Sequence, residues 1–169
     1  MMPGSLKGDM MTVYYSRPRL QSLSQGDRLA FVRKFRRISQ QELGERIGIR
    51  VRARNQICRI ERTSRDLRPD RLEKIAEVLN VNTNMLKRWN FENPEDLFYA
   101  LLWTEALCPD FMFRYTAKQT PQNKTHEFLS ERYADWKKMR RRYLDGRIEF
   151  EEYWEWKLKR TDREEDANE

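Results

Sequence analysis

Four polar side chains that each carry paired hydrogen-bonding groups lie within six residues of one another: Arg54, Asn55, Gln56 and Arg59. A guanidinium donates two parallel hydrogen bonds, and a carboxamide donates and accepts at once. This chemistry suits recognition of flat, polar edges. Ile57 and Ile60 recur at helical spacing, so a helix that buries both isoleucines turns the four polar side chains outward.

The segment around these residues is strongly basic. From Arg28 to Arg71 there are 14 Arg or Lys residues against 5 acidic ones, a local charge of +9 in a chain of +7. From Asp145 to Glu169 the balance reverses to 10 acidic against 5 basic residues. A positive segment favours a polyphosphate partner, because each neutralised phosphate releases condensed counterions. Composition alone fits a solvated basic surface equally well.

Residues that support catalysis or metal binding are sparse. Cys58 and Cys108 lie far apart and His126 is the single histidine, a pattern that excludes a zinc finger and argues against a disulfide framework. The sequence has no Gly-rich phosphate loop, and the paired acids Glu151 and Glu152 fall on an expected exposed helix face. We therefore expect no enzyme, no catalytic or metal-binding residue and no cofactor.

Hydropathy places the chain away from membranes. No apolar run approaches the ~20 residues that a membrane span needs, and the N-terminus lacks the apolar stretch of a signal peptide. The sequence therefore predicts a cytoplasmic protein with reduced thiols and no membrane partner.

The elements that must position the polar cluster are helices. Apolar spacing predicts helices at about 27–37, 40–47, 53–62 and 69–79, and then a fifth that Asn82 caps and that carries Met85, Leu86 and Trp89. Ser39 and Glu42 have the spacing of a capping box, Gly48 ends the second helix, and Pro69 suits a first helical turn. Residues 1–23 are expected to form a flexible N-terminal arm that carries Arg17 and Arg19.

The second half is also expected to be helical. Asn93-Pro94 opens a sixth helix that is apolar on all sides, which either joins the two halves or forms a subunit contact. A short strand at Cys108–Tyr115 and a polar loop at Thr116–Lys124 follow. Helices at His126–Leu144 and Glu149–Lys159, joined at Asp145-Gly146, are predicted to form an antiparallel hairpin. Its first helix offers an aromatic stripe, and its second offers Phe150, Tyr153, Trp154 and Leu158 to the same interface.

The stretch Gly26–Trp89 resembles the Xre, or Cro/C1-type, family of helix-turn-helix regulators. The matching elements are Asp27-Arg28-Leu29, Ile38 to Leu43, Ile47-Gly48, Ile57 to Glu61, Arg68-Pro69, and Leu72 with Ile75-Ala76 and Leu79. The resemblance implies an all-α protein in which a five-helix repressor-type domain precedes a smaller helical region that ends in the hairpin. The expected divisions are an arm at 1–23, the DNA-binding domain at 24–90, a helical region at 91–160 for oligomerisation or partner binding, and a disordered acidic tail at 161–169.

Two positions depart from the family pattern. Gly44 replaces a usual alanine, which costs about 1 kcal/mol of helix propensity but keeps the helices close. The extra Arg50-Val51-Arg52 lengthens either the turn or the start of the recognition helix. Regulators of Gram-positive bacteria and their mobile elements carry a similar extra segment. Some also end in a hairpin like Tyr133-Ala134-Asp135-Trp136 followed by Asp145-Gly146-Arg147-Ile148 and Glu151-Glu152-Tyr153.

The resemblance implies roles for the polar residues. The helix at 53–62 enters the major groove, where Arg bonds guanine and Asn or Gln bonds adenine. The expected base-reading residues are Arg54, Asn55, Gln56 and Arg59. The expected contacts to the DNA backbone are Ser39, Gln40, Gln41, Arg50, Arg52 and Arg62. Glu61 is expected to order the turn that follows it, and the basic run Lys137 to Arg142 is expected to be a solvated face.

The leading hypothesis is a sequence-specific regulator of transcription, a repressor from a phage or mobile element, that binds double-stranded DNA as a homodimer in the bacterial nucleoid. The sixth helix or the hairpin is the expected dimer contact. The alternative is a protein-binding inhibitor, such as an anti-CRISPR protein, that binds its target through residues 91–160. Its helix-turn-helix would then serve autoregulation. For each single site residue, a solvated polar side chain remains the other interpretation.

Overall fold

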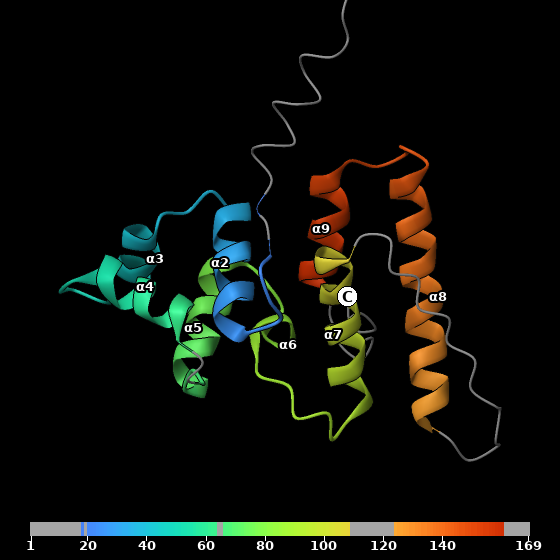
Figure 1. The fold of residues 1–169 in the computed structure, drawn as a ribbon, viewed down its shortest axis with the longest axis horizontal. Coiled ribbons are helices and arrows are strands. Elements are labelled where there is room, and N and C mark those ends of the chain that lie inside the picture. Colours follow the sequence, from blue (N-terminus) through green and yellow to red (C-terminus); the bar gives the residue numbers. More distant parts are fainter. Residues whose placement is uncertain (1–17, 19, 64–65, 109–123, 161–169) are drawn as a thin grey trace, which may run out of the picture.

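The computed structural model describes residues 18, 20–63, 66–108 and 124–160, with side chains from 128 onward in the last range. These residues form eight helices and no strand, which confirms the all-α class (Figure 1). The helices are α2 (Gln25–Phe35), α3 (Gln40–Arg46), α4 (Ala53–Arg62), α5 (Pro69–Leu79), α6 (Thr83–Leu86), α7 (Pro94–Leu107), α8 (Lys124–Leu144) and α9 (Phe150–Lys159). No helix in the described ranges combines the length and the apolar character needed to cross a bilayer.

Helix α2 is shifted by two residues from its predicted range. The Ser24 hydroxyl accepts a hydrogen bond from the Asp27 amide at 3.2 Å, so the helix begins at Gln25. It ends at Phe35 because Arg37, the last residue of the predicted helix, has a left-handed φ of 57°.

The predicted capping box of α3 is confirmed. The Ser39 hydroxyl accepts from the Glu42 amide at 3.0 Å, and the Glu42 carboxylate accepts from the Ser39 amide at 3.4 Å. The helix ends at Arg46, and Gly48 follows with a φ of 88° that an L-residue rarely adopts.

The fifth predicted helix is shorter than expected. Helix α6 ends at Leu86, so the prediction that Trp89 belongs to it is wrong. The backbone is extended at Lys87, whose carbonyl accepts from the Arg28 guanidinium at 2.7 Å. The Trp89 ring packs against the same guanidinium, with 3.7 Å between its centroid and the guanidinium carbon. A buried side chain from α2 therefore fixes the chain here in place of another helical turn.

Several expectations for the second half fall on residues outside the described ranges. Cys108 follows α7 and donates its amide to the Thr104 carbonyl at 2.9 Å. The rest of the predicted strand, the loop at 116–123 and the tail at 161–169 lie outside the described residues. Helix α8 begins at Lys124, two residues before the predicted start.

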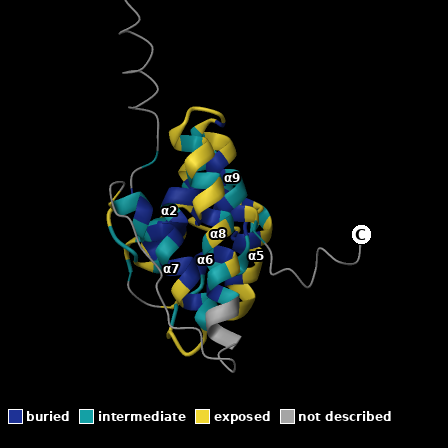
Figure 2. Cartoon of the chain, turned by 90° about the vertical axis from the view of Figure 1, so that its right-hand side faces the viewer, coloured by how far each residue is buried: buried dark blue, intermediate teal, exposed yellow. Residues whose placement is uncertain are grey.

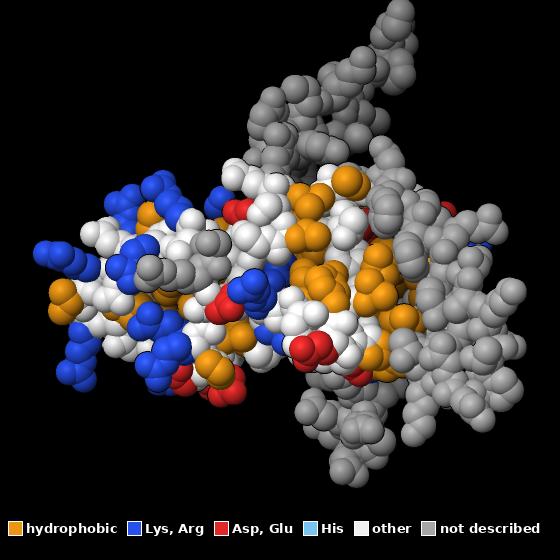
Figure 3. Space-filling model, turned by 60° about the horizontal axis from the view of Figure 1, so that its bottom comes forward, with side chains coloured by type: hydrophobic (Ala, Val, Ile, Leu, Met, Phe, Trp, Pro, Cys, Tyr) orange, Lys and Arg blue, Asp and Glu red, His pale blue; other side chains and the backbone are white. Residues whose placement is uncertain are grey.

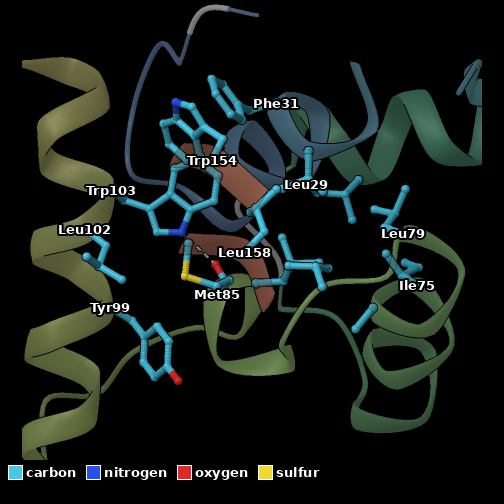
Figure 4. Packing of buried hydrophobic residues seen from close by; sticks show 14 of the residues in the cluster. Leu29, Phe31, Ile75, Leu79, Met85, Tyr99, Leu102, Trp103, Trp154 and Leu158 are labelled. Carbon is cyan, nitrogen blue, oxygen red and sulfur yellow. Dashed lines mark hydrogen bonds between the residues drawn. The ribbon is translucent and has the colours of Figure 1, made fainter. Parts of the chain in front are cut away.

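One apolar core runs through both halves of the chain. Phe31 of α2, Trp103 of α7 and Trp154 of α9 form an aromatic cluster, with ring centroids 4.5 to 5.3 Å apart (Figure 4). Helix α7 therefore joins the two halves, which is the first of the two roles predicted for it. Leu20, at the end of the predicted N-terminal arm, is also buried in this core.

The predicted antiparallel hairpin of α8 and α9 is present, and the rings of Tyr143 and Tyr153 stack across it at 5.0 Å. Trp154 and Leu158, however, do not face α8 as expected. Trp154 packs against Phe31 of α2 and Trp103 of α7, and Leu158 lies in the same central core, as Figure 4 shows. The helical period of α9 gives it two apolar faces, so its residues divide between the hairpin and the central core. Figure 2 shows the resulting pattern, in which exposed residues face outward from α8 and α9.

A buried polar network ties α7, α8 and α9 together. The Glu105 carboxylate on α7 accepts from Lys157 Nζ at 2.6 Å, from the Tyr153 hydroxyl at 2.6 Å and from Arg140 Nε at 2.8 Å. The Trp136 indole N–H adds a fourth hydrogen bond at 3.2 Å. Burial alone would raise the pKa of Glu105, but Lys157, the Tyr153 hydroxyl and the charge of Arg140 together outweigh it and hold that pKa below its ordinary value.

Candidate nucleic-acid interface

Helix α4 lies at the left-hand end of the molecule in Figure 1 and packs through one apolar face. Ala53 and Ile57 are buried on that face, with exposed fractions of 2% and 0%. The four predicted base-reading residues are all exposed: Arg54, Asn55, Gln56 and Arg59. The structure therefore brings these side chains together on the surface of one helix.

Gly44 allows α3 and α4 to approach closely. A Cβ atom at this position would lie 2.8 Å from the Ala53 Cβ, closer than real Cβ atoms come to other atoms, and a tight 3.1 Å from the Ala53 Cα. Both positions are buried and inside or at the start of a helix. The departure from alanine at Gly44 therefore has a steric reason.

We expect Gly44→Ala to lower the free energy of unfolding, although alanine favours a helix by about 1 kcal/mol. The overpacked contact should cost about 1–3 kcal/mol and exceed that gain. The measurement is urea denaturation followed by circular dichroism. The double variant Gly44→Ala/Ala53→Gly removes the closest contact, which is between the two Cβ atoms. Its loss of unfolding free energy should therefore be smaller than the sum of the losses of the two single variants. Strictly additive losses would contradict the steric explanation.

The extra segment lengthens the turn and leaves the recognition helix unchanged, because α4 begins at Ala53. Arg50, Val51 and Arg52 are exposed between the buried Ile49 and Ala53. Arg52 has a left-handed φ of 51°. The Gln56 side-chain Nε2 donates to the Val51 carbonyl at 3.0 Å and closes the turn onto the first turns of α4.

Gln41 orients the N-terminus of α4. Arg52, the residue before α4, makes no side-chain capping bond. Instead the Gln41 side-chain oxygen accepts from the Arg54 amide at 3.1 Å, while its nitrogen donates to Glu45 at 2.5 Å. The role predicted for Gln41 from the sequence was only a contact to the DNA backbone. The cap joins residues 13 positions apart, so no local pattern indicated it.

Glu61 anchors the recognition helix to the two helices behind it. Its carboxylate accepts two hydrogen bonds from Arg33 of α2, at 2.6 and 3.1 Å, and one from Gln40 of α3 at 2.7 Å. The Arg33 and Glu61 side chains are both less than 10% exposed. The prediction that Glu61 orders the following turn is therefore wrong, because its partners come from earlier in the chain.

Five exposed arginines surround the outward side of α4 without an acidic partner: none forms an ion pair with a carboxylate in the described ranges. They are Arg50, Arg52, Arg54, Arg59 and Arg62. Figure 3 shows Lys and Arg side chains gathered at this end of the molecule. A concentration of unneutralised positive charge attracts a polyanion such as the phosphate backbone of DNA.

Two arginines counted in the basic segment belong to the interior. Arg28 is 1% exposed and donates to the carbonyl oxygens of Met85 and Lys87, at 2.5 and 2.7 Å. Burial lowers the pKa of Arg28 to about 9. Arg33 is equally committed to Glu61. The charge that faces solvent near α4 is therefore smaller than the sequence count of +9.

The second basic run belongs to α8, at the other end of the molecule from α4 (Figure 1). Arg140 points inward to Glu105, while Arg141 and Arg142 lie within 4 Å of Asp145 and Glu152. These residues do not extend the arginine surface around α4. Among the described residues no group of three or more His, Cys, Asp or Glu side chains is placed to hold a metal ion.

The comparisons with known proteins agree with this geometry. Residues 26–89 match the model of a family described as a helix-turn-helix domain. Searches of curated proteins and of solved structures gave no match. The matched range spans α2 to α6 and includes all ten predicted site residues. Residues 26–89 are therefore a helix-turn-helix domain, a kind of domain that indicates DNA binding and regulation of transcription.

Proposed function

We propose that this protein is a sequence-specific, non-enzymatic regulator of transcription that reads double-stranded DNA through the exposed side of α4. The observation that carries the proposal is the surface of that helix. Arg54, Asn55, Gln56 and Arg59 are exposed beside arginines that lack an acidic partner among the described residues. Side chains of these types recognise guanine and adenine edges in the major groove, and the surrounding charge binds phosphates.

Contacts to the DNA backbone fall to residues around the helix ends. Arg50, Arg52 and Arg62 are exposed and suited to phosphates. Ser39, Gln40 and Gln41 lie at the start of α3, the helix that packs against α4. Gln40 donates one N–H of its side-chain amide to Glu61 in the free protein, which leaves the second N–H for a phosphate.

Repression follows if the bound protein occludes a promoter. The resemblance to Xre-type regulators supports a gene from a phage or mobile element. A DNA-binding protein of this kind would be located at the bacterial nucleoid. A homodimer would match paired DNA half-sites. Helix α7 buries Phe98, Tyr99, Leu102 and Trp103 inside the chain, so the α8–α9 hairpin is the better candidate for the dimer contact. A protein target for residues 91–160 stays a prediction.

The double variant Arg54→Ala/Arg59→Ala tests the assignment of base-reading residues. Sequences enriched by the wild-type protein from random DNA provide the probe, and affinity is measured by gel shift. Each bidentate arginine–guanine pair contributes about 1–3 kcal/mol of discrimination, so the double variant should lose roughly 100-fold or more of its preference.

Two single variants serve as controls. Arg50→Ala should weaken binding to all sequences alike and reduce the slope of log affinity against log salt by about 1. Arg141→Ala, exposed on α8 far from α4, should leave binding unchanged. Unchanged specificity in the Arg54/Arg59 variant would show that the reading surface lies elsewhere.

A further inference from the structure

The turn between α3 and α4 presents an apolar side chain in a basic surface. Val51 is 68% exposed, which makes it the most exposed of the large apolar residues in the described chain. Arg50 and Arg52, its neighbours on both sides, are exposed as well. Ordinary packing gives no reason for an apolar residue here.

The turn is held in a defined shape. Ile49 and Ala53 are buried at its two ends, so only three residues project from the core. Arg52 adopts a left-handed conformation, which is strained for an L-residue. The hydrogen bond from Gln56 to the Val51 carbonyl fixes the tip relative to α4. Strain of this kind persists where surrounding contacts determine it, and it gathers at functional sites.

The position of the tip limits what it can touch. Val51 lies two residues before the first residue of α4, and the N-terminal part of a recognition helix is the part that contacts base edges. The unpaired arginines around it make a polyanion the fitting partner. On DNA the apolar group within reach of the major groove is the 5-methyl group of thymine, which aliphatic side chains recognise.

We propose that Val51 is a specificity-determining residue that contacts a thymine methyl group beside the bases read by α4. This inference rests on the proposed DNA-binding function and adds to it a reader outside the recognition helix. Arg50 and Arg52 then hold the phosphates on either side, and Gln56 has a second role in holding the tip.

A double-mutant cycle between protein and DNA tests the contact. DNA selected with the wild-type full chain is remade with deoxyuridine in place of single thymines, which removes only the methyl group. Burying one methyl group contributes about 0.8 kcal/mol, so wild type should bind roughly fourfold more weakly at one substituted position. Compared with wild type, Val51→Ala should bind the thymine DNA more weakly by a similar factor. On DNA with deoxyuridine at that one position, Val51→Ala and wild type should bind with nearly equal affinity, because the methyl group is already absent.

The controls separate this contact from other effects. Val51→Ile should keep the thymine preference, and Val51→Ala should keep the wild-type melting temperature because the side chain is exposed. Equal losses for Val51→Ala on thymine and deoxyuridine DNA at every position would overturn the inference and leave the proposed function standing. Failure of the wild-type protein to enrich any sequence would overturn the proposed function, and this inference with it.

Discussion

Replacing Glu105 with glutamine should lower the free energy of unfolding by about 3–5 kcal/mol, because it removes the charge that compensates two buried cations. Lys157 is 1% exposed and Arg140 is 13% exposed at the side chain, and both donate to this carboxylate. Glutamine also places an NH2 group where a donor now points, either at Oε1, which accepts from Arg140, or at Oε2, which accepts from Lys157, Tyr153 and Trp136. Guanidinium denaturation of the full chain measures the loss.

The exposed residue Glu152 provides the matched control. It lies 3.9 Å from Arg142 with both side chains largely exposed, so Glu152→Gln should cost no more than about 1 kcal/mol. A double variant, Glu105→Met/Lys157→Met, should lose less stability than Glu105→Gln, since it also removes one of the two buried cations. It should not restore wild-type stability, because Arg140 and the Tyr153 hydroxyl still lose the carboxylate that accepts from them. If Glu105→Gln and Glu152→Gln cost the same, the network is not a major source of stability.

Replacing Gly26 with alanine should be similarly severe, with a loss of at least about 3 kcal/mol. A Cβ atom on Gly26 would lie 2.3 Å from the Glu61 carbonyl oxygen and 2.8 Å from its carbon. These are backbone atoms at the end of the recognition helix, so no side-chain rotation relieves the contact. The displacement of α4 from α2 should also weaken DNA binding, which gel shifts at a temperature where the variant is folded would detect.

Gly48→Ala is the matched control because it is the same chemical change at a different kind of position. A Cβ atom on Gly48 meets nothing within 4 Å, but its φ of 88° is strained for alanine. Its cost should be about 1–2 kcal/mol, from backbone conformation alone. A loss for Gly26→Ala no larger than that of Gly48→Ala would refute the close contact between α2 and α4.

The sequence predicted helix ends well where the end depends on residues close to it in the chain. The capping box of Ser39 and Glu42 and the proline at the start of α5 depend on residues one turn apart, and both are present. The end of α6 was mispredicted because it depends on Arg28, which lies 59 residues before Lys87 in the chain. The predicted contacts of Glu61 and Trp154 are wrong for the same reason, because Arg33 and Phe31, which they contact, lie far from them in the chain.

The polar cluster on the outward side of α4 shows the same division between local and long-range causes. The sequence alone determined that Arg54, Asn55, Gln56 and Arg59 share the outward side of one helix, because helical periodicity and the burial of Ile57 require it. The tertiary structure decided how that helix is held, through Gly44, Gln41 and Glu61. It also decided that the extra residues form a projecting turn and that α7 joins the two halves. These features arise from contacts between segments far apart in the chain, which residue spacing does not encode.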